Sequence, residues 1–94
     1  MIKSFASKRT ARFASGEQVK EFGGFAKQAR QRILLLDAAV SLRAIGEVPG
    51  NRLEALRGDR LGQYSIRINK QWRLCFEWND KERCAEKVEI VDYH

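Results

Sequence analysis

The spacing of hydrophobic residues changes near the middle of the chain. Before residue 50 the apolar residues recur at helical intervals, whereas beyond it they alternate with polar ones. The first pattern predicts a long helix from about Phe25, whose apolar face comprises Phe25, Ala29, Ile33, Leu34, Leu35, Leu36 and Val40. The second pattern predicts three strands at about 64–68, 72–78 and 88–91. The chain is therefore expected to be an α+β protein, with two N-terminal helices packed on one face of a small antiparallel sheet.

Shorter signals precede the long helix. Ile2–Phe5 is typical of a short strand, and Ser7 is a candidate N-cap for a helix that runs to about Ser15 and ends at Gly16. No repeat or linker interrupts the sequence, so residues 1–94 are predicted to form a single domain. Glycine and proline mark the expected breaks at Gly23-Gly24, Gly46 and Pro49-Gly50.

The alternation also predicts how the first two of these strands pair. Their apolar residues share the helix-covered face only if the intervening turn has an odd length, such as Asn69–Gln71. This register pairs Ile66 with Leu74 and places Arg67 directly across from Arg73. Like charges in that position are destabilising, and an anion bound between them would relieve the repulsion. The arginine pair is therefore a candidate anion site.

The same reasoning applies to the second hairpin. An odd turn at Asn79–Arg83 predicts that Leu74 pairs with Val88 and that Arg73 faces Glu89. The register also leaves a purely structural alternative open, in which acidic side chains neutralise the arginine pair. The residues available for that role are Glu77 and Glu89.

Composition adds a preference for anionic partners. The 94 residues carry a formal net charge of +6. Such a cationic surface favours a polyanion or an acidic protein, although a merely solvated surface is the simpler alternative. Six basic residues lie between positions 51 and 73, against two acidic ones. They are Arg52, Arg57, Arg60, Arg67, Lys70 and Arg73.

The two cysteines and the hydrophobic runs indicate in which cellular compartment the protein is expected. Cys75 and Cys84 are too few for a disulfide framework, and the predicted register points them to opposite faces of the sheet. The longest apolar run is too short for a membrane span, and the N-terminus lacks a secretory pattern. We therefore expect a cytoplasmic protein that does not bind membranes.

The last three residues, Asp92, Tyr93 and His94, are candidates for proton transfer. RNA can be cut by its own 2′-hydroxyl if a base, an acid and cations surround the phosphate. His94 titrates near neutral pH and suits the acid role, while Arg73 is the candidate cation at the phosphate, with Arg57 as a second one. A frayed terminus is the alternative. Further RNA contacts are expected from Arg52, Arg60, Arg67 and Lys70. One histidine and two separated cysteines form no ligand cluster, so no metal or other cofactor is expected.

Several motifs resemble one known family. They are Gly50–Arg60, Gln63–Asn69, Gln71–Phe76 and Val88–His94, with the opening Met1–Phe5 and the segment Leu36–Ala39. Together they are similar to the HigB-type killer toxins of bacterial toxin–antitoxin systems, within the RelE/ParE superfamily. The resemblance covers nearly the whole chain.

The resemblance implies a fold, an activity and partners. The fold would be a RelE-like domain, and the activity that of an mRNA interferase, which enters the ribosomal A site and cuts mRNA there. A HigA-like helix-turn-helix antitoxin would neutralise the toxin, and operator DNA would be bound only through that antitoxin. Arg73 matches the phosphate-stabilising arginine of the family, and Arg57 stands where lysine is often found. The terminal catalytic positions match Asp92, Tyr93 and His94.

Two positions depart from the family pattern. Some members carry an active-site histidine where this chain has Glu54, and near relatives often have histidine in place of Tyr64. One alternative is a ParE-like inhibitor of a protein target such as DNA gyrase, which needs no catalytic terminus. Another is a weakly active or non-toxic protein that binds RNA or the ribosome.

Overall fold

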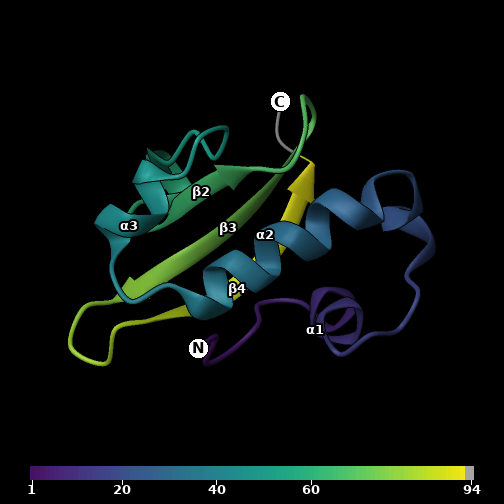
Figure 1. Cartoon of the computed structure of the whole chain (residues 1–94), viewed down its shortest axis with the longest axis horizontal. Helices are drawn as coiled ribbons and strands as arrows, with labels where there is room; N and C mark the ends of the chain where they lie inside the picture. The colour runs from purple at the N-terminus through teal and green to yellow at the C-terminus, as the bar shows by residue number, and fades with distance from the viewer. Residues whose placement is uncertain (93–94) are drawn as a thin grey trace.

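The computed structural model describes residues 1–92, and they form an α+β fold as predicted (Figure 1). A four-stranded antiparallel sheet has the order β1-β2-β3-β4. Helix α2 packs against β3 and β4, and α1 packs against β4. The elements are α1 (Lys8–Ala14), η1 (Lys20–Phe25), α2 (Ala26–Ala38), α3 (Leu42–Glu47), β1 (Glu54–Ala55), η2 (Gly58–Arg60), β2 (Tyr64–Arg67), β3 (Trp72–Asn79) and β4 (Cys84–Asp92).

Helix α1 begins and ends where the sequence predicts. The Ser7 Oγ accepts a hydrogen bond from the Thr10 backbone N–H at 3.2 Å, and Gly16 follows with a φ of +108°. The hydroxyl of the buried Thr10 also accepts a hydrogen bond from the Ile90 backbone N–H at 3.1 Å, which ties α1 to β4. The expected break at Gly23-Gly24 is wrong, because both glycines lie within the 3₁₀-helix η1.

Helix α2 is shorter than predicted. Ala29, Ile33 and Leu36 are buried as expected, but Leu34 is 68% exposed and does not belong to the core. Val40 is 63% exposed because α2 ends at Ala38. A further helix, α3, then begins with Ser41 as its N-cap and was not predicted. It has only six residues and contains Gly46, which the sequence analysis interpreted as a break.

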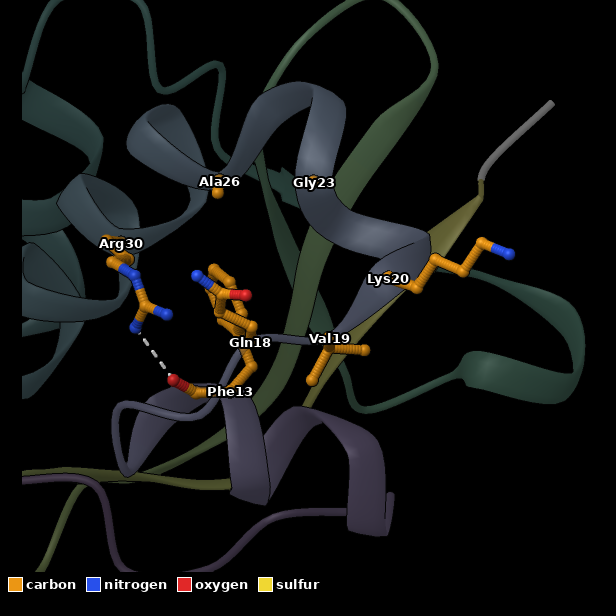
Figure 2. Close-up of a pocket in the computed structure, with 7 residues that line it drawn as sticks. All are labelled: Phe13, Gln18, Val19, Lys20, Gly23, Ala26 and Arg30. Atoms are coloured by element: carbon orange, nitrogen blue, oxygen red, sulfur yellow. Dashed lines mark hydrogen bonds between the residues drawn. The ribbon is translucent and has the colours of Figure 1, made fainter.

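The core lies between the helices and the sheet, and aromatic rings form its centre. The Phe22 ring meets the Phe13 ring edge-on with centroids 5.3 Å apart, and the rings of Phe25 and Trp72 are 4.9 Å apart. Arg30 of α2 stacks over the Phe13 ring at 4.0 Å, and its Nη1 donates to the Phe13 carbonyl at 2.8 Å (Figure 2). This arginine bridges α1 and α2 directly.

The first predicted register is confirmed and the second is wrong. Arg67 pairs with Arg73 across β2 and β3, as expected. In the second hairpin, however, Arg73 pairs with Val91 and Leu74 pairs with Ile90.

The predicted odd turn at Asn79–Arg83 is wrong, because Asn79 pairs with Cys84 and leaves a turn of four residues. A β-bulge between Cys75 and Glu77 of β3 then shifts the register by one further residue. Lys87, on the facing part of β4, has a φ of +52°. The apolar residues of β3 and β4 still lie on one face of the sheet, but their cross-strand partners differ from the predicted ones.

The shorter turn also changes the predicted placement of the cysteines. Both are buried and free, as predicted. Cys84 pairs with Asn79, so alternation places it on the same face as Cys75 and not on the opposite one. The two thiols remain apart because Asn79 is four residues along β3 from Cys75, which corresponds to roughly 13 Å.

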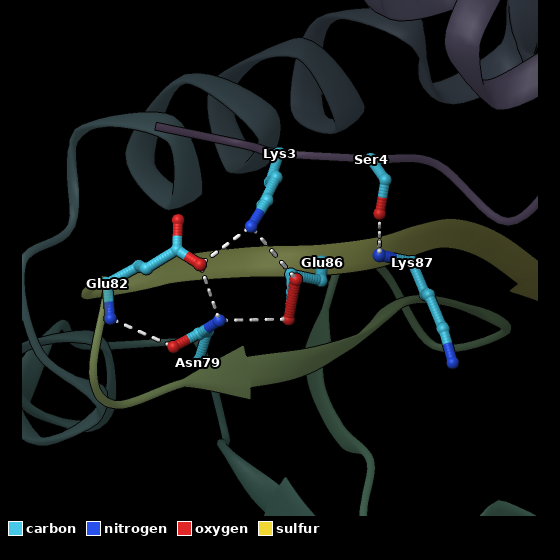
Figure 3. Close-up of polar contacts among 6 residues, drawn as sticks. All are labelled: Lys3, Ser4, Asn79, Glu82, Glu86 and Lys87. Carbon is cyan, nitrogen blue, oxygen red and sulfur yellow. Dashed lines mark hydrogen bonds and ion pairs between the residues drawn. The ribbon is translucent and has the colours of Figure 1, made fainter.

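The N-terminal segment lies along β4 without becoming a full strand. Ile2 and Phe5 form isolated parallel bridges with Ala85 and Val88, in place of the expected strand. The polar side chains between them hold the hairpin (Figure 3). The Lys87 backbone N–H donates to the Ser4 Oγ at 2.9 Å. Lys3 forms ion pairs with Glu82 at 2.6 Å and with Glu86 at 3.9 Å. The Asn79 side chain donates to Glu82 and Glu86 and accepts a hydrogen bond from the Glu82 backbone N–H at 2.8 Å.

Candidate functional site: a basic hollow beside the β2–β3 turn

A hollow of about 330 Å³ lies beside the β2–β3 turn, on the face of the sheet that points away from the helices. We call it the basic hollow. Four cationic side chains and one carboxylate line it, so it carries a net positive charge. Its lining residues are Arg52, Glu54, Arg67, Asn69, Lys70 and Arg73. The hollow therefore brings together four of the six basic residues singled out between positions 51 and 73.

Arg73 is the least exposed cation of the hollow, at 8%. Its Nε donates to the Ser65 hydroxyl at 2.7 Å, and its Nη2 donates to the Arg52 carbonyl at 2.6 Å. Nη2 also lies 3.4 Å from the Glu54 carboxylate. A buried charge is tolerated only where such partners compensate for lost water, and these partners fix the guanidinium in one orientation. The side chain is thus preorganised at the floor of the hollow.

Glu54 is the carboxylate nearest to Arg73, and its side chain is 56% exposed. In the sequence it stands out only as a departure from the family pattern, and the alternative to a bound anion was that Glu77 and Glu89 neutralise the arginine pair. That alternative is wrong, because Glu77 binds Lys87 at 3.4 Å and Glu89 binds Arg60 at 3.6 Å. No sequence signal indicated Glu54, since β1 has only two residues and shows no alternation.

The loop before β1 holds the Arg52 carbonyl in place. Asn51 is fully buried, and its side-chain amide donates to the Ile45 carbonyl at 2.9 Å. Its own carbonyl accepts a hydrogen bond from the Arg67 backbone N–H at 2.6 Å. Arg52 then adopts a φ of +48°, a left-handed conformation that is uncommon outside glycine. This backbone geometry is how the loop presents a carbonyl to Arg73.

The other basic candidates are divided between two places. Arg52, Arg67 and Lys70 line the basic hollow with Arg73. Arg57 is exposed and lines a neighbouring hollow of about 430 Å³, which meets the basic hollow at Glu54. Arg60 lies outside both lining sets and is bound to Glu89 and to the Gln63 side chain at 3.0 Å. The RNA contact expected of Arg60 stays a prediction.

Of the three C-terminal candidates for proton transfer, the structure describes only Asp92. Asp92 pairs with Trp72, and its carboxylate accepts a hydrogen bond from the Gln71 side chain at 2.9 Å. Strand alternation places Asp92 on the Trp72 side of the sheet, whereas Arg73 points to the other side. The structure therefore does not bring Asp92 to Arg73. Tyr93 and His94 lie outside the described residues.

Residues 1–92 contain neither a metal-binding cluster nor a helix that could span a membrane. Residues 1–92 bring no three His, Cys, Asp or Glu side chains together in a way that could hold a metal ion. Within the same range, no helix is long and apolar enough to cross a membrane. Burial raises the pKa of the Cys75 thiol, which disfavours a reactive thiolate.

Comparisons with known proteins agree on one family. A family model described as the RelE-like toxin of the type II toxin–antitoxin system HigB matches residues 3–94. Toxin HigB-1 of Vibrio cholerae serotype O1 is 46% identical over 50 residues, which cover 53% of this chain and 53% of that toxin. The matched part therefore spans about half the length of that relative.

Solved structures share the fold at low sequence identity. A YoeB/ParE toxin from Agrobacterium tumefaciens has a TM-score of 0.59 and 16% identity, over 99% of this chain and 98% of that one. A chain of a YoeB–YefM complex from Staphylococcus aureus has a TM-score of 0.56 and 21% identity, over 100% of this chain and 98% of that one. These likenesses confirm the predicted RelE-like architecture.

Proposed function

The chain belongs to the HigB-like family of RelE-type toxins of type II toxin–antitoxin systems, and we propose that it is a ribosome-dependent endoribonuclease that cuts mRNA. The observation that carries this proposal is Arg73, a nearly buried cation fixed at the floor of the basic hollow. A fixed cation in a partly dehydrated site stabilises developing negative charge far better than one in bulk water.

The basic hollow suits a phosphodiester group. The contacts of Arg73 with Ser65, Arg52 and Glu54 use its Nε and Nη2 atoms. The N–H groups of its Nη1 are therefore the ones we assign to a phosphate oxygen in the hollow. Lys70 and Arg67 at the rim would bind the flanking phosphates, since arginine and lysine both recognise phosphate readily.

Glu54 is the residue that we assign as the proton acceptor. Its carboxylate lies at the rim of the hollow and is exposed enough to move away from Arg73 when a phosphate enters. It would take the proton of the 2′-hydroxyl as that oxygen bonds to phosphorus. The bond to the 5′-oxygen then breaks, and that oxygen gains a proton from an acid, for which His94 stays the prediction. The products are a 2′,3′-cyclic phosphate and a 5′-hydroxyl, with no metal required.

An antitoxin completes the proposal. The family description names a type II toxin–antitoxin system, and a structural neighbour is a YoeB–YefM toxin–antitoxin complex. By analogy, this protein would be neutralised by a HigA-like helix-turn-helix antitoxin, and operator DNA would be bound through that antitoxin alone. The excess of basic over acidic residues favours an acidic partner surface.

Mapping of mRNA ends after brief induction tests the nuclease. Primer extension should show cuts at in-frame codons that require translation, and Arg73→Ala should reduce them by about 100-fold or more. Glu54→Gln should reduce them by a similar factor, because it removes a proton acceptor but keeps the shape. Circular dichroism and thermal unfolding of both variants would show that they fold. A folded Arg73→Ala variant that cuts normally would overturn the proposal.

One observation favours a second candidate. The guanidinium of Arg73 already has three protein partners, as a purely structural arginine would. In that case the protein would be a ParE-like inhibitor of a protein target such as DNA gyrase. Growth arrest without mRNA cuts, which persists when Asp92, Tyr93 and His94 are deleted, would support this function instead.

A further inference from the structure

Asn51 is a fully buried polar residue beside the basic hollow, although it does not belong to the lining of the hollow. Three hydrogen bonds hold it. Its backbone N–H donates to the Val48 carbonyl at 3.2 Å, and its side-chain Nδ2 donates to the Ile45 carbonyl at 2.9 Å. Its own carbonyl accepts from the Arg67 backbone N–H at 2.6 Å. The residue is thereby fixed both to α3 and to β2.

The side-chain amide of Asn51 includes an atom that destabilises the fold. Its Oδ1 is buried and has no hydrogen-bond partner among residues 1–92. An unpaired buried acceptor is unfavourable, whereas an apolar side chain of similar shape would avoid that loss. The part of the amide that contributes to the structure is therefore the Nδ2 donor, which reaches the Ile45 carbonyl.

The backbone on both sides of Asn51 is left-handed. Gly50 has a φ of +86° and Arg52 has a φ of +48°. Glycine adopts this conformation without steric strain, but a residue with a Cβ does not. The strained residue is the one whose carbonyl accepts the hydrogen bond from Nη2 of Arg73 at 2.6 Å. Some contact must hold Arg52 in this conformation, and its anchored neighbour Asn51 is placed to do so.

We propose that Asn51 is a positioning residue, whose buried amide fixes the arginine pair of the hollow through the backbone. It acts on Arg73 through the Arg52 carbonyl, and on Arg67 through its own carbonyl. These two arginines pair across β2 and β3, and both line the basic hollow. The inference rests on the proposed function, in which both arginines bind RNA phosphates.

Nuclear magnetic resonance of the arginine side chains tests the positioning without a nuclease assay. Because Nη2 of Arg73 is held, rotation of its guanidinium should be slow, and its two Nη groups should give separate signals. Arg73→Ala identifies these signals by their loss. Asn51→Ala should merge them, whereas the control Thr10→Val should leave them separate. Thr10 is equally buried and accepts its hydrogen bond from the Ile90 N–H, outside the hollow.

Substitutions at position 52 distinguish backbone positioning from a merely structural role of Asn51. Arg52→Gly and Arg52→Ala both remove the side chain, but only glycine tolerates a left-handed φ. Cleavage of mRNA on purified ribosomes should fall roughly tenfold in Asn51→Ala, because Arg73 is misplaced. When combined with Asn51→Ala, Arg52→Gly should cut about fivefold faster than Arg52→Ala. With Asn51 intact, the glycine and alanine variants should differ much less.

Three results would overturn the proposal. The first is separate Arg73 signals in a folded Asn51→Ala variant. The second is an equal advantage of glycine over alanine with and without Asn51. The third is merged signals in Arg52→Ala, which retains Asn51 and decides the matter even if Asn51→Ala does not fold. If the native protein cuts no mRNA, the proposed function fails, but the resonance experiment still shows whether Asn51 positions Arg73.

Discussion

The basic hollow and the α1–α2 groove are both cationic, but they differ in what lies beneath the charge. The α1–α2 groove consists of three hollows along these two helices, which are joined at Arg30, Ala14 and Leu34. In the hollow, the floor is the guanidinium of Arg73, which is held by the Ser65 hydroxyl and the Arg52 carbonyl. In the groove, the floor is apolar, and the guanidinium of Arg30 lies over the Phe13 ring at 4.0 Å. The comparison teaches that positive charge alone does not specify a partner. A polar floor suits phosphate, whereas an apolar floor suits a protein side chain.

The two surfaces also differ in how they depend on the fold. Phe13 of the groove belongs to the main core and contacts Phe22 edge-on. Ser65 and Arg73 are buried too, but they lie outside that core on the other face of the sheet. Damage to the groove floor should therefore destabilise the protein, whereas damage to the hollow floor should mainly misplace one arginine.

The largest effect is expected from Phe13→Ala. It removes a ring that is 1% exposed and leaves a cavity, so the free energy of unfolding should fall by about 3–5 kcal/mol. Urea denaturation followed by tryptophan fluorescence measures this change. Leu34→Ala is the control and should change stability little, since Leu34 is largely exposed. An equal loss in the two variants would show that the groove is not built as described.

A smaller effect is expected from Ser65→Ala in the hollow. The variant leaves the Nε of Arg73 without its hydroxyl acceptor, which should cost about 1.5–3 kcal/mol of stability. The remaining partners would hold the guanidinium less firmly, so mRNA cleavage should fall by about tenfold. Ser65→Thr retains the hydroxyl and should keep most of the activity. If cleavage by Ser65→Ala matched that of the native protein after correction for the folded fraction, Ser65 would not position Arg73.

The smallest effect is expected from Lys3→Met at the N-terminal segment, which carries Ile2 and Phe5 of the groove wall. The hydrogen bond between Lys3 and Glu82 raises the pKa of the lysine above 10.5 and lowers that of the glutamate below 4.5. The stabilisation is therefore present between these two ordinary values. It is lost as pH falls through the lowered carboxyl pKa, and again as pH rises through the raised ammonium pKa.

Thermal unfolding at several pH values would reveal this contribution. The native protein should melt slightly above Lys3→Met near pH 7, and the difference should disappear in strong acid, where Glu82 is protonated. Both groups are exposed, so high salt should also shrink the difference. A difference that persists at low pH would contradict an ionic origin and would point to packing of the lysine stem. Cleavage in the hollow should not change.

Much of the fold could be predicted from local patterns. Helical spacing located Ala29, Ile33 and Leu36 on the buried face, and the Ser7 cap located the start of α1. The odd turn correctly placed Arg67 across from Arg73. These features depend on neighbours in sequence, so the chain specifies them without knowledge of distant contacts. The family motifs likewise identified the toxin family, which the comparisons confirm.

Other features required the tertiary structure. The four-residue turn and the bulge near Lys87 together moved Glu89 away from Arg73, and the pairing of β1 with β2 brought Glu54 there instead. The sequence pattern also could not predict that Leu34 is exposed. Helical periodicity does not tell whether other residues cover a leucine at the edge of the apolar face. By itself the sequence determined the α+β class, the arginine pair and the toxin family. Only the tertiary structure decided which carboxylate meets Arg73 and which leucine stays uncovered, since both depend on contacts between segments that are distant in the chain.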